Sequence, residues 1–371
     1  MKLGTIRGIN IELHYSTLLI VGLAGYSAST FFNTNFPIAE LFDVILFGVI
    51  SGLVILLSIL AHELMHSIIA MNHGIDVEEI EFYFFGGVSK IVEDPEEGST
   101  EIQIAIVGPL TSLGIGGVLY LLSLISWPGL ITVPLLFYLG IVNLGLGLFN
   151  LLPAFPMDGG RVLRAILWKR RDNLISATRT AVKTGRVIGA IMIGWGFFQL
   201  LFAGVLGGIW MIVLGNFVRS NSTRAYTETV ITENLSYLKI EQIMSDPYPV
   251  IDANLTVGDA MTQYFMNYQK QHFLVQVDGD IKGVMHLEHA QNIPPQKRQE
   301  TLVKEIMQPL NNIPTIDSSS NGKEAFQAFR RSAEESDILL VMDESETEIA
   351  GFIEENNFRR AIEVMGASNA G

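Results

Sequence analysis

Hydrophobic residues gather in long runs over the first 220 positions of the chain, with few polar interruptions. A helix that crosses a bilayer needs about 20 mostly apolar residues. Four runs meet this length, and they cover Tyr15–Phe32, Val44–Met71, Ile102–Ile125 and Ile131–Leu152. The stretch Val187–Val218 has room for two short spans with a turn near Gly204–Gly208, or for one long tilted helix. The pattern therefore predicts six transmembrane helices, or five in the second case.

Basic residues decide between the two counts, because Lys and Arg gather on the cytoplasmic side of membrane proteins. They lie before the first run, between the fourth run and Val187, and after the last run at Arg219 and Arg224. Six spans place all of these clusters on one side, whereas five would place Arg219 and the C-terminal part outside. We therefore expect a multi-pass protein of the cell membrane with six spans, and with its N-terminus and C-terminal part in the cytoplasm.

Composition supports a membrane-embedded front part and a soluble back part. Hydrophobic residues make up 49% of the 371 residues and charged residues only 17%, against about 25% charged in average soluble domains. Most of the net charge of −14 lies beyond residue 224. This acidic part argues against a nucleic-acid partner. The chain has no cysteine, which excludes disulfides, cysteine-ligated metals and thiol nucleophiles.

Ionisable residues inside the second apolar run point to a metal site. The run contains His62-Glu63-Leu64-Met65-His66, and polar side chains at membrane depth are functional by default. The two histidines are four residues apart, so they share one helix face and can bind one metal ion. Glu63 can then contact a metal-bound water as a general base. His73 and His14 are interpreted as interfacial residues.

A third ligand is expected from the segment after the fourth run, because catalytic zinc usually has three protein ligands and a water. Pro153 and Pro156 break the helix there, and Asp158 follows them. Irregular backbone at membrane depth is tolerated where it is buried in protein or lines a wet cavity. Asp158 is thus the expected third ligand, and the alternative is that it only caps the next helix. Asn143 and Asn150 share a face of the fourth run. They are candidates for binding substrate, or for hydrogen bonds between helices.

The His-Glu-x-x-His motif, followed by Asn150-x-x-Pro153-x-x-Pro156-x-Asp158-Gly-Gly at the end of another membrane helix, resembles the site-2 protease family of intramembrane zinc metalloproteases. The resemblance covers about residues 1–224 and includes Gly86-Gly87 and Gly108-Pro109. It implies one Zn²⁺ per chain held by His62, His66 and Asp158, with Glu63 as general base and Asn150 in contact with substrate. The implied substrate is a membrane-anchored protein, cut within or beside the lipid bilayer.

Residues 79–92 partly alternate between polar and apolar positions around Gly86-Gly87, which predicts a hairpin beside the membrane. The family resemblance suggests that an extended substrate could pair with its edge. The alternative is a loop that shields the site.

The C-terminal part contains an internal repeat. Leu238–Met244 returns as Leu302–Met307, His272–Asp278 as Asp337–Asp343, and the segment from Ile281 as the segment from Ile349. Each unit is read as helix, helix, strand, turn, strand, helix. This pattern resembles a tandem pair of CBS domains, modules that often bind adenosine nucleotides and can pair into a homodimer.

The usual nucleotide-binding Ser/Thr and Asp of CBS modules are replaced here. The corresponding positions hold His286 and His289 in the first repeat, and Glu354 and Asn357 in the second. This departure argues against ordinary nucleotide binding and favours a module for gating or dimerisation. His286 and His289 are interpreted as surface or strand-end residues in preference to a second metal site.

The sequence therefore predicts a polytopic α-helical membrane protein of about six transmembrane helices with a cytosolic α/β tandem CBS module. The expected divisions are a metalloprotease domain over 1–219, a polar linker over 220–236, and CBS repeats over 237–295 and 296–371. The alternative function is a CBS-regulated membrane transporter or channel. A transport pathway needs polar residues spread through the membrane depth, whereas here they gather around one constellation.

Overall fold

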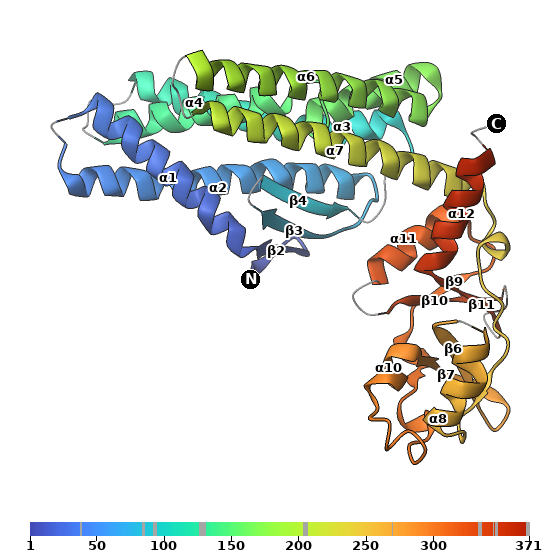
Figure 1. The fold of residues 1–371 in the computed structure, drawn as a ribbon. Coiled ribbons are helices and arrows are strands. Elements are labelled where there is room, and N and C mark those ends of the chain that lie inside the picture. Colours follow the sequence, from blue (N-terminus) through green and yellow to red (C-terminus); the bar gives the residue numbers. More distant parts are fainter. Residues whose placement is uncertain are drawn as a thin grey trace. The chain divides into compact units, whose positions relative to one another are not determined.

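The computed structural model describes residues 1–37, 39–83, 86–91, 95–125, 131–202, 207–268, 270–332, 336–343, 345 and 348–368. The chain divides into two compact units, Met1–Thr229 and Val230–Gly371. Figure 1 shows the helical first unit and the mixed second unit. Each is described by itself below.

Five helices of the first unit are long and apolar enough to cross a membrane. They are α1 (Tyr15–Asn35), α2 (Leu41–Asn72), α3 (Gly98–Ile125), α4 (Thr132–Asn150) and α6 (Leu174–Phe202). Many large apolar side chains on them are exposed, among them Leu57, Leu121 and Phe202. A surface of this kind suits lipid rather than water. The prediction of a polytopic α-helical membrane protein is confirmed.

The helix at the predicted sixth span is 30 residues long, but only its first part is apolar. The turn proposed near Gly204–Gly208 falls mostly outside the described residues, but α6 ends before it and α7 (Gly207–Ser236) begins at its far side. The two helices run antiparallel in close contact, because Gly189 faces Gly215 and Gly196 faces Gly208. The apolar part of α7 ends at Arg219, so this helix is not among the five that meet the criteria for a span.

The segment 220–236, expected to be a polar linker, is the second half of α7. The border between the two units falls within it, after Thr229. Its side chains explain the helix: Ser222 is buried and donates a hydrogen bond to the carbonyl of Phe155, and Leu235 is buried in a core of the second unit. These contacts stabilise the helical conformation of a segment whose polar composition predicts a loop.

A four-stranded sheet lies beside α2, with its strands in the order β1-β2-β3-β4 (Figure 1). The predicted hairpin is present as β3 (Val77–Tyr83) and β4 (Gly86–Ile91), which pair antiparallel. Two further strands, β1 (Lys2–Ile6) and β2 (Ile9–Leu13), were not predicted, and β2 pairs parallel to β3. Ile9, Ile80 and Phe82 bury their side chains against α2 in one core. The sheet is thereby fixed to the helix that carries the histidine motif.

One short helix, α5 (Asp158–Arg171), packs against α3 and α6. Its first residue is Asp158, and Met157 holds the capping position before it. The guanidinium of Arg164 in α5 donates two hydrogen bonds to the buried carboxylate of Glu101 in α3, one of them 2.8 Å from Nε. This buried pair fixes α5 to α3, and thereby sets where Asp158 lies.

The second unit contains two similar hairpins. In the first repeat β6 (His272–Val277) pairs antiparallel with β7 (Asp280–His286) and parallel with β5 (Ile251–Asp252). In the second, β10 (Ile338–Met342) pairs in the same way with β11 (Ile349–Glu354) and β9 (Thr315–Asp317). The helices α8 (Val257–Ala260), α9 (Met266–Tyr268), α10 (Leu287–Asn292), α11 (Gly322–Ser332) and α12 (Glu355–Ser368) complete the repeats. The predicted internal repeat and the tandem CBS architecture are confirmed.

The compact cores do not follow the predicted repeat boundaries. Ile240 and Ile243, from the start of the first repeat, are buried in the core of the second hairpin. Val303, from the start of the second repeat, is buried in the core of the first, and β8 (Gln308–Pro309) pairs with β7. Each repeat thus lends its first segment to the other, so the two cannot be cut apart at residue 295.

Candidate metal centre

The two histidines of the motif lie inside unit one on the buried face of α2. Four residues of helix separate them, so the rings stand one turn apart with their centroids 4.9 Å from each other. Both side chains are about 5% exposed. A pair of buried imidazoles on one face of an apolar helix is the arrangement that the spacing predicted.

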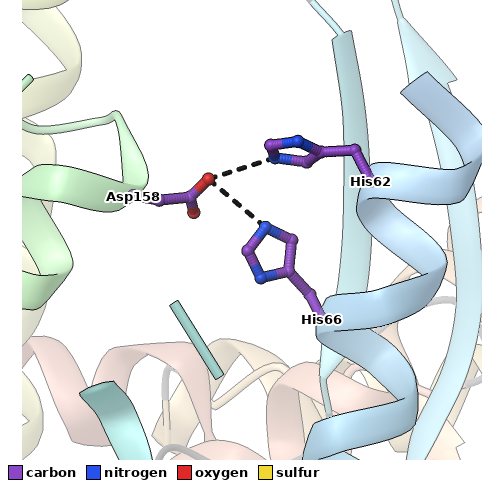
Figure 2. Close-up of side chains that lie close together, drawn as sticks. All are labelled: His62, His66 and Asp158. Carbon is purple, nitrogen blue, oxygen red and sulfur yellow. Dashed lines mark hydrogen bonds and ion pairs between the residues drawn. The ribbon is translucent and has the colours of Figure 1, made fainter. Parts of the chain in front are cut away.

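Asp158 faces both histidines from the first turn of α5 (Figure 2). Its Oδ2 lies 3.1 Å from Nε2 of His62 and 3.3 Å from Nε2 of His66. Asp158 is the first residue of α5, and Met157, which makes no side-chain cap hydrogen bond, holds the capping position. The prolines before it carry the chain out of α4 and back toward α2.

The far nitrogen of each imidazole is held by α3. Nδ1 of His62 lies 2.9 Å from Oγ of Ser112, and Nδ1 of His66 donates to the carbonyl of Ile104 at 2.6 Å. A carbonyl can only accept, so Nδ1 of His66 carries a proton, and Nε2, which faces Asp158, is the nitrogen left to bind a metal ion. Partners of this kind orient metal-ligating histidines. Ser112 was not predicted, because it lies 50 residues from His62 and belongs to no motif.

The three side chains fit a zinc ion. Zinc takes imidazole nitrogen and carboxylate oxygen at about 2.0–2.2 Å, so in a tetrahedral site neighbouring ligand atoms are about 3.3 Å apart. The observed separations of 3.1 and 3.3 Å match that spacing. The backbone of α3 closes one side, because a Cβ on Gly108 would lie 2.1 Å from Nε2 of His66 and 2.7 Å from Nε2 of His62. Only a residue without a side chain leaves the ligand atoms accessible there.

Glu63 lies beside the ligand set, on the wall of a cavity of about 800 Å³. The cavity is lined mainly by apolar side chains from α1, α2, α4 and α7, and it also exposes His62, His66 and Asp158. The backbone of β4 closes over Glu63, since a Cβ on Gly87 would lie 2.5 Å from its Cγ. A carboxylate, three ligands and an open volume therefore meet at one place.

The two asparagines separate in the structure. Asn150 lines the cavity, and its amide donates to the carbonyl of Leu146 within α4. Asn143 is 1% exposed, donates to the carbonyl of Leu139, and is not among the residues that line the cavity. Although the two asparagines share a helix face, only Asn150 reaches the site, because the cavity is lined by α4 from Leu146 onward. Asn221 of α7 also lines the cavity and was not predicted.

Comparison with known proteins agrees with this site. The model of Peptidase family M50 matches residues 51–132 and 129–194, a region that contains all three ligands. The chain is 30% identical to the "Putative zinc metalloprotease Rip3" of Mycobacterium tuberculosis, over 85% of this chain and 81% of that protein. It is 33% identical to the "Zinc metalloprotease MJ0392" of Methanocaldococcus jannaschii, over 73% and 72%.

Solved structures are similar to each unit in turn. The site-2 protease from Methanocaldococcus jannaschii aligns with 33% identity and a TM-score of 0.45, covering 61% of this chain and 94% of that one. A CBS domain of a bacterial CNNM/CorC family Mg²⁺ transporter aligns with 14% identity and a TM-score of 0.32, covering 43% and 96%.

A metallopeptidase site embedded among membrane-spanning helices is thus the class that the fold and the side chains define. On the strength of the sequence similarity, the chain belongs to Peptidase family M50. The predicted membership of the site-2 protease family, and the assignment as a zinc metalloprotease, are confirmed.

Proposed function

We propose that this protein cleaves a peptide bond within or beside the transmembrane segment of a membrane-anchored protein. The observation that carries the proposal is the meeting of His62, His66 and Asp158 with Glu63 on one largely apolar cavity between membrane-spanning helices. Such a cavity offers an apolar segment an environment similar to lipid, with a hydrolytic site on its wall. The proposed peptidase domain is residues 1–219, and residues 237–295 and 296–371 are the proposed CBS repeats.

The three ligands would hold one Zn²⁺ per chain, with Nε2 of each imidazole and a carboxylate oxygen of Asp158 as ligand atoms. Bound zinc supplies a Lewis acid that polarises the scissile carbonyl and makes water nucleophilic near neutral pH. Ser112 and the carbonyl of Ile104 keep both imidazoles in the required orientation. Glu63 accepts the proton of the attacking water and delivers it to the leaving amide nitrogen.

Substrate binding is proposed for β4 and Asn150. β4 is the last strand of the sheet order, so its outer edge has no partner strand among the described residues. Gly86 and Gly87 of that strand line the cavity together with Glu63. A helical segment has its carbonyls bonded internally, so it has to unwind before cleavage, and an unpaired strand edge can bind the unwound chain. Asn150 is the proposed donor to that chain from the opposite wall.

The C-terminal unit is proposed to gate the peptidase from the cytoplasm. The N-terminus is proposed to lie on the same side, and the distribution of Lys and Arg supports this orientation. In the second repeat, Asn357 stands at a position that binds the nucleotide in many CBS modules, and its side chain is used for hydrogen bonds within the protein. Asn357 accepts from the amide of Glu354 and donates to Ile243 and Ser245. Gating without a nucleotide is therefore favoured, and a homodimer through this unit stays a prediction.

Mapping of cleavage sites by mass spectrometry tests this function. Purified enzyme in lipid vesicles would be given a single-span model substrate, with the same extramembrane sequence lacking the span as control. We expect cuts within or next to the span, in wild type but not in Glu63→Gln, and no cutting of the control. Cutting of the spanless control at an equal rate would contradict the proposal. Zinc-dependent ion flux without cleavage would favour the transporter alternative.

A further inference from the structure

A second group of metal-ligating side chains lies in the C-terminal unit. It consists of His272, the first residue of β6; His286, the last residue of β7; and Asp337, immediately before β10. His272 and His286 are directly opposite each other in the antiparallel pair β6/β7, and such partners point to the same face of the sheet. Asp337 reaches them from the second repeat, so the group joins the two repeats.

Each of the three side chains offers one ligand atom, and these atoms all lie within 4.8 Å of one another. Nδ1 of His286 lies 3.1 Å from Nδ1 of His272 and 3.1 Å from Oδ1 of Asp337. Nε2 of His272 lies 3.5 Å from Oδ2 of Asp337. Ligand atoms of a tetrahedral zinc site are about 3.3 Å apart. The two 3.1 Å separations share Nδ1 of His286 and are close to this spacing, whereas the 3.5 Å separation joins the other nitrogen of His272 to the other oxygen of Asp337.

Burial distinguishes this group from a surface cluster. The side chains of His272 and His286 are 5% and 6% exposed, whereas Asp337 is 59% exposed. Nε2 of His286 is buried and has no hydrogen-bond partner among the described residues. This nitrogen is not the one that faces His272 and Asp337, which is Nδ1. Two buried imidazoles with an exposed carboxylate above them leave an entry path for an ion.

We propose that His272, His286 and Asp337 form a second metal site, which binds Zn²⁺ or a similar late first-row divalent ion and ties the two repeats together. Two imidazoles and one carboxylate suit zinc, copper or nickel. Mg²⁺ and Ca²⁺ prefer oxygen ligands throughout. The fourth ligand is water or His289, whose ring centroid lies 4.7 Å from that of His286. The prediction that His286 is only a strand-end residue is thereby revised: it ends β7, but with its ring buried against two further ligands.

An ion here would act as a structural link. His272 and His286 belong to the hairpin of the first repeat and Asp337 to that of the second. An ion that binds the folded unit and not the unfolded one stabilises the folded form. Metal availability would then control how firmly the two repeats are held together. This inference does not depend on the peptidase activity of the first unit.

Metal analysis of the full-length protein tests the site, with the affinity tag removed and zinc chloride or cobalt chloride as the probe. In the variant His62→Ala/His66→Ala, which removes the first site, we expect one remaining equivalent of zinc, and visible Co²⁺ absorption bands of a tetrahedral site. Adding Asp337→Asn to that variant should remove the equivalent and the bands. Asp337 is exposed and the change conserves its shape, so the fold should persist. Adding Asp280→Asn, which changes a still more exposed carboxylate paired with Lys282, should leave the equivalent bound.

Two outcomes would overturn the second site. One is a folded His62→Ala/His66→Ala variant that binds no zinc or cobalt. The other is unchanged binding after Asp337→Asn. If wild type and the double histidine variant both bind one equivalent, the site in the first unit fails and the second site stands, so the two proposals are separable.

Discussion

Gly108 lies directly against His66: a Cβ at position 108 would be 2.1 Å from Nε2 of that imidazole. The backbone of α3 therefore forms one wall of the metal centre. A methyl group on this wall would overlap the ligand nitrogens of both histidines, whose side chains are buried.

Gly108→Ala should therefore remove the metal of the first unit while leaving the helices folded. The expected result is one zinc fewer per chain than in wild type and no cleavage, measured by metal analysis and a cleavage assay on one preparation. Gly114→Ala is the matched control, because it lies on the same helix and a Cβ there meets nothing within 4 Å. Full zinc content in Gly108→Ala would contradict the close approach of Gly108 to the ligand nitrogens of His62 and His66.

Gly87→Ala should give the complementary result. A Cβ at position 87 would lie 2.5 Å from Cγ and 3.1 Å from Cδ of Glu63, so it displaces the proposed base without touching the ligands. We expect zinc content equal to wild type with the cleavage rate lowered at least about 100-fold, within the range that general-base catalysis contributes. Gly145→Ala, in open space on α4, is the control. Equal activity in Gly87→Ala would argue against Glu63 as base.

Ser112→Ala should weaken zinc binding without abolishing it. The hydroxyl orients His62 through Nδ1 at 2.9 Å, and loss of such a partner typically costs roughly 10- to 100-fold in metal affinity. Competition with a zinc chelator of known affinity measures the change. Thr111→Ala provides the comparison, because the Thr111 hydroxyl bonds within α3 to the carbonyl of Val107. An unchanged affinity in Ser112→Ala would mean that packing alone orients His62.

Arg164→Ala should destabilise the first unit. It leaves the carboxylate of Glu101, 1% exposed, with Arg161 at 3.9 Å as its one remaining basic partner among the described residues. Removing one partner of a buried ion pair costs roughly 3–5 kcal/mol. Thermal unfolding in detergent should show a lower midpoint than in Arg171→Ala, which changes an exposed arginine.

A double substitution separates charge from packing at the same place. Replacing Glu101 and Arg164 together by leucine removes the uncompensated charge, and apolar replacement of a buried pair is often neutral. The double variant should be more stable than Arg164→Ala alone. If it is less stable, the destabilisation comes from lost contacts between α3 and α5 rather than from the buried charge.

The sequence predicted those parts of the molecule whose cause is local. Apolar runs of 20 residues identified α1 to α4, and the four-residue spacing alone placed His62 and His66 on one face. Asp158 was predicted as the third ligand because Pro153 and Pro156 indicate a break in the helix just before it. In contrast, β1 and β2 were missed, because strands of five residues beside a membrane span carry little periodicity of their own.

The remaining features depend on contacts between distant segments. Ser112 supports His62 from 50 residues away, and Asn143 is excluded from the cavity by the packing of α4. The His272–His286–Asp337 group requires the register of β6 with β7 and the approach of the second repeat. The exchange of first segments between the repeats likewise follows from shared cores, which a linear repeat does not reveal.

Zinc content and cleavage, measured together on wild type, Glu63→Gln and Asp158→Ala, test the central claim most directly. The account predicts that Glu63→Gln keeps the full zinc content of wild type and does not cut the membrane-anchored substrate. It predicts that Asp158→Ala holds one zinc fewer and does not cut either. Cleavage by Glu63→Gln at the wild-type rate, or full zinc content in an Asp158→Ala protein, would contradict it.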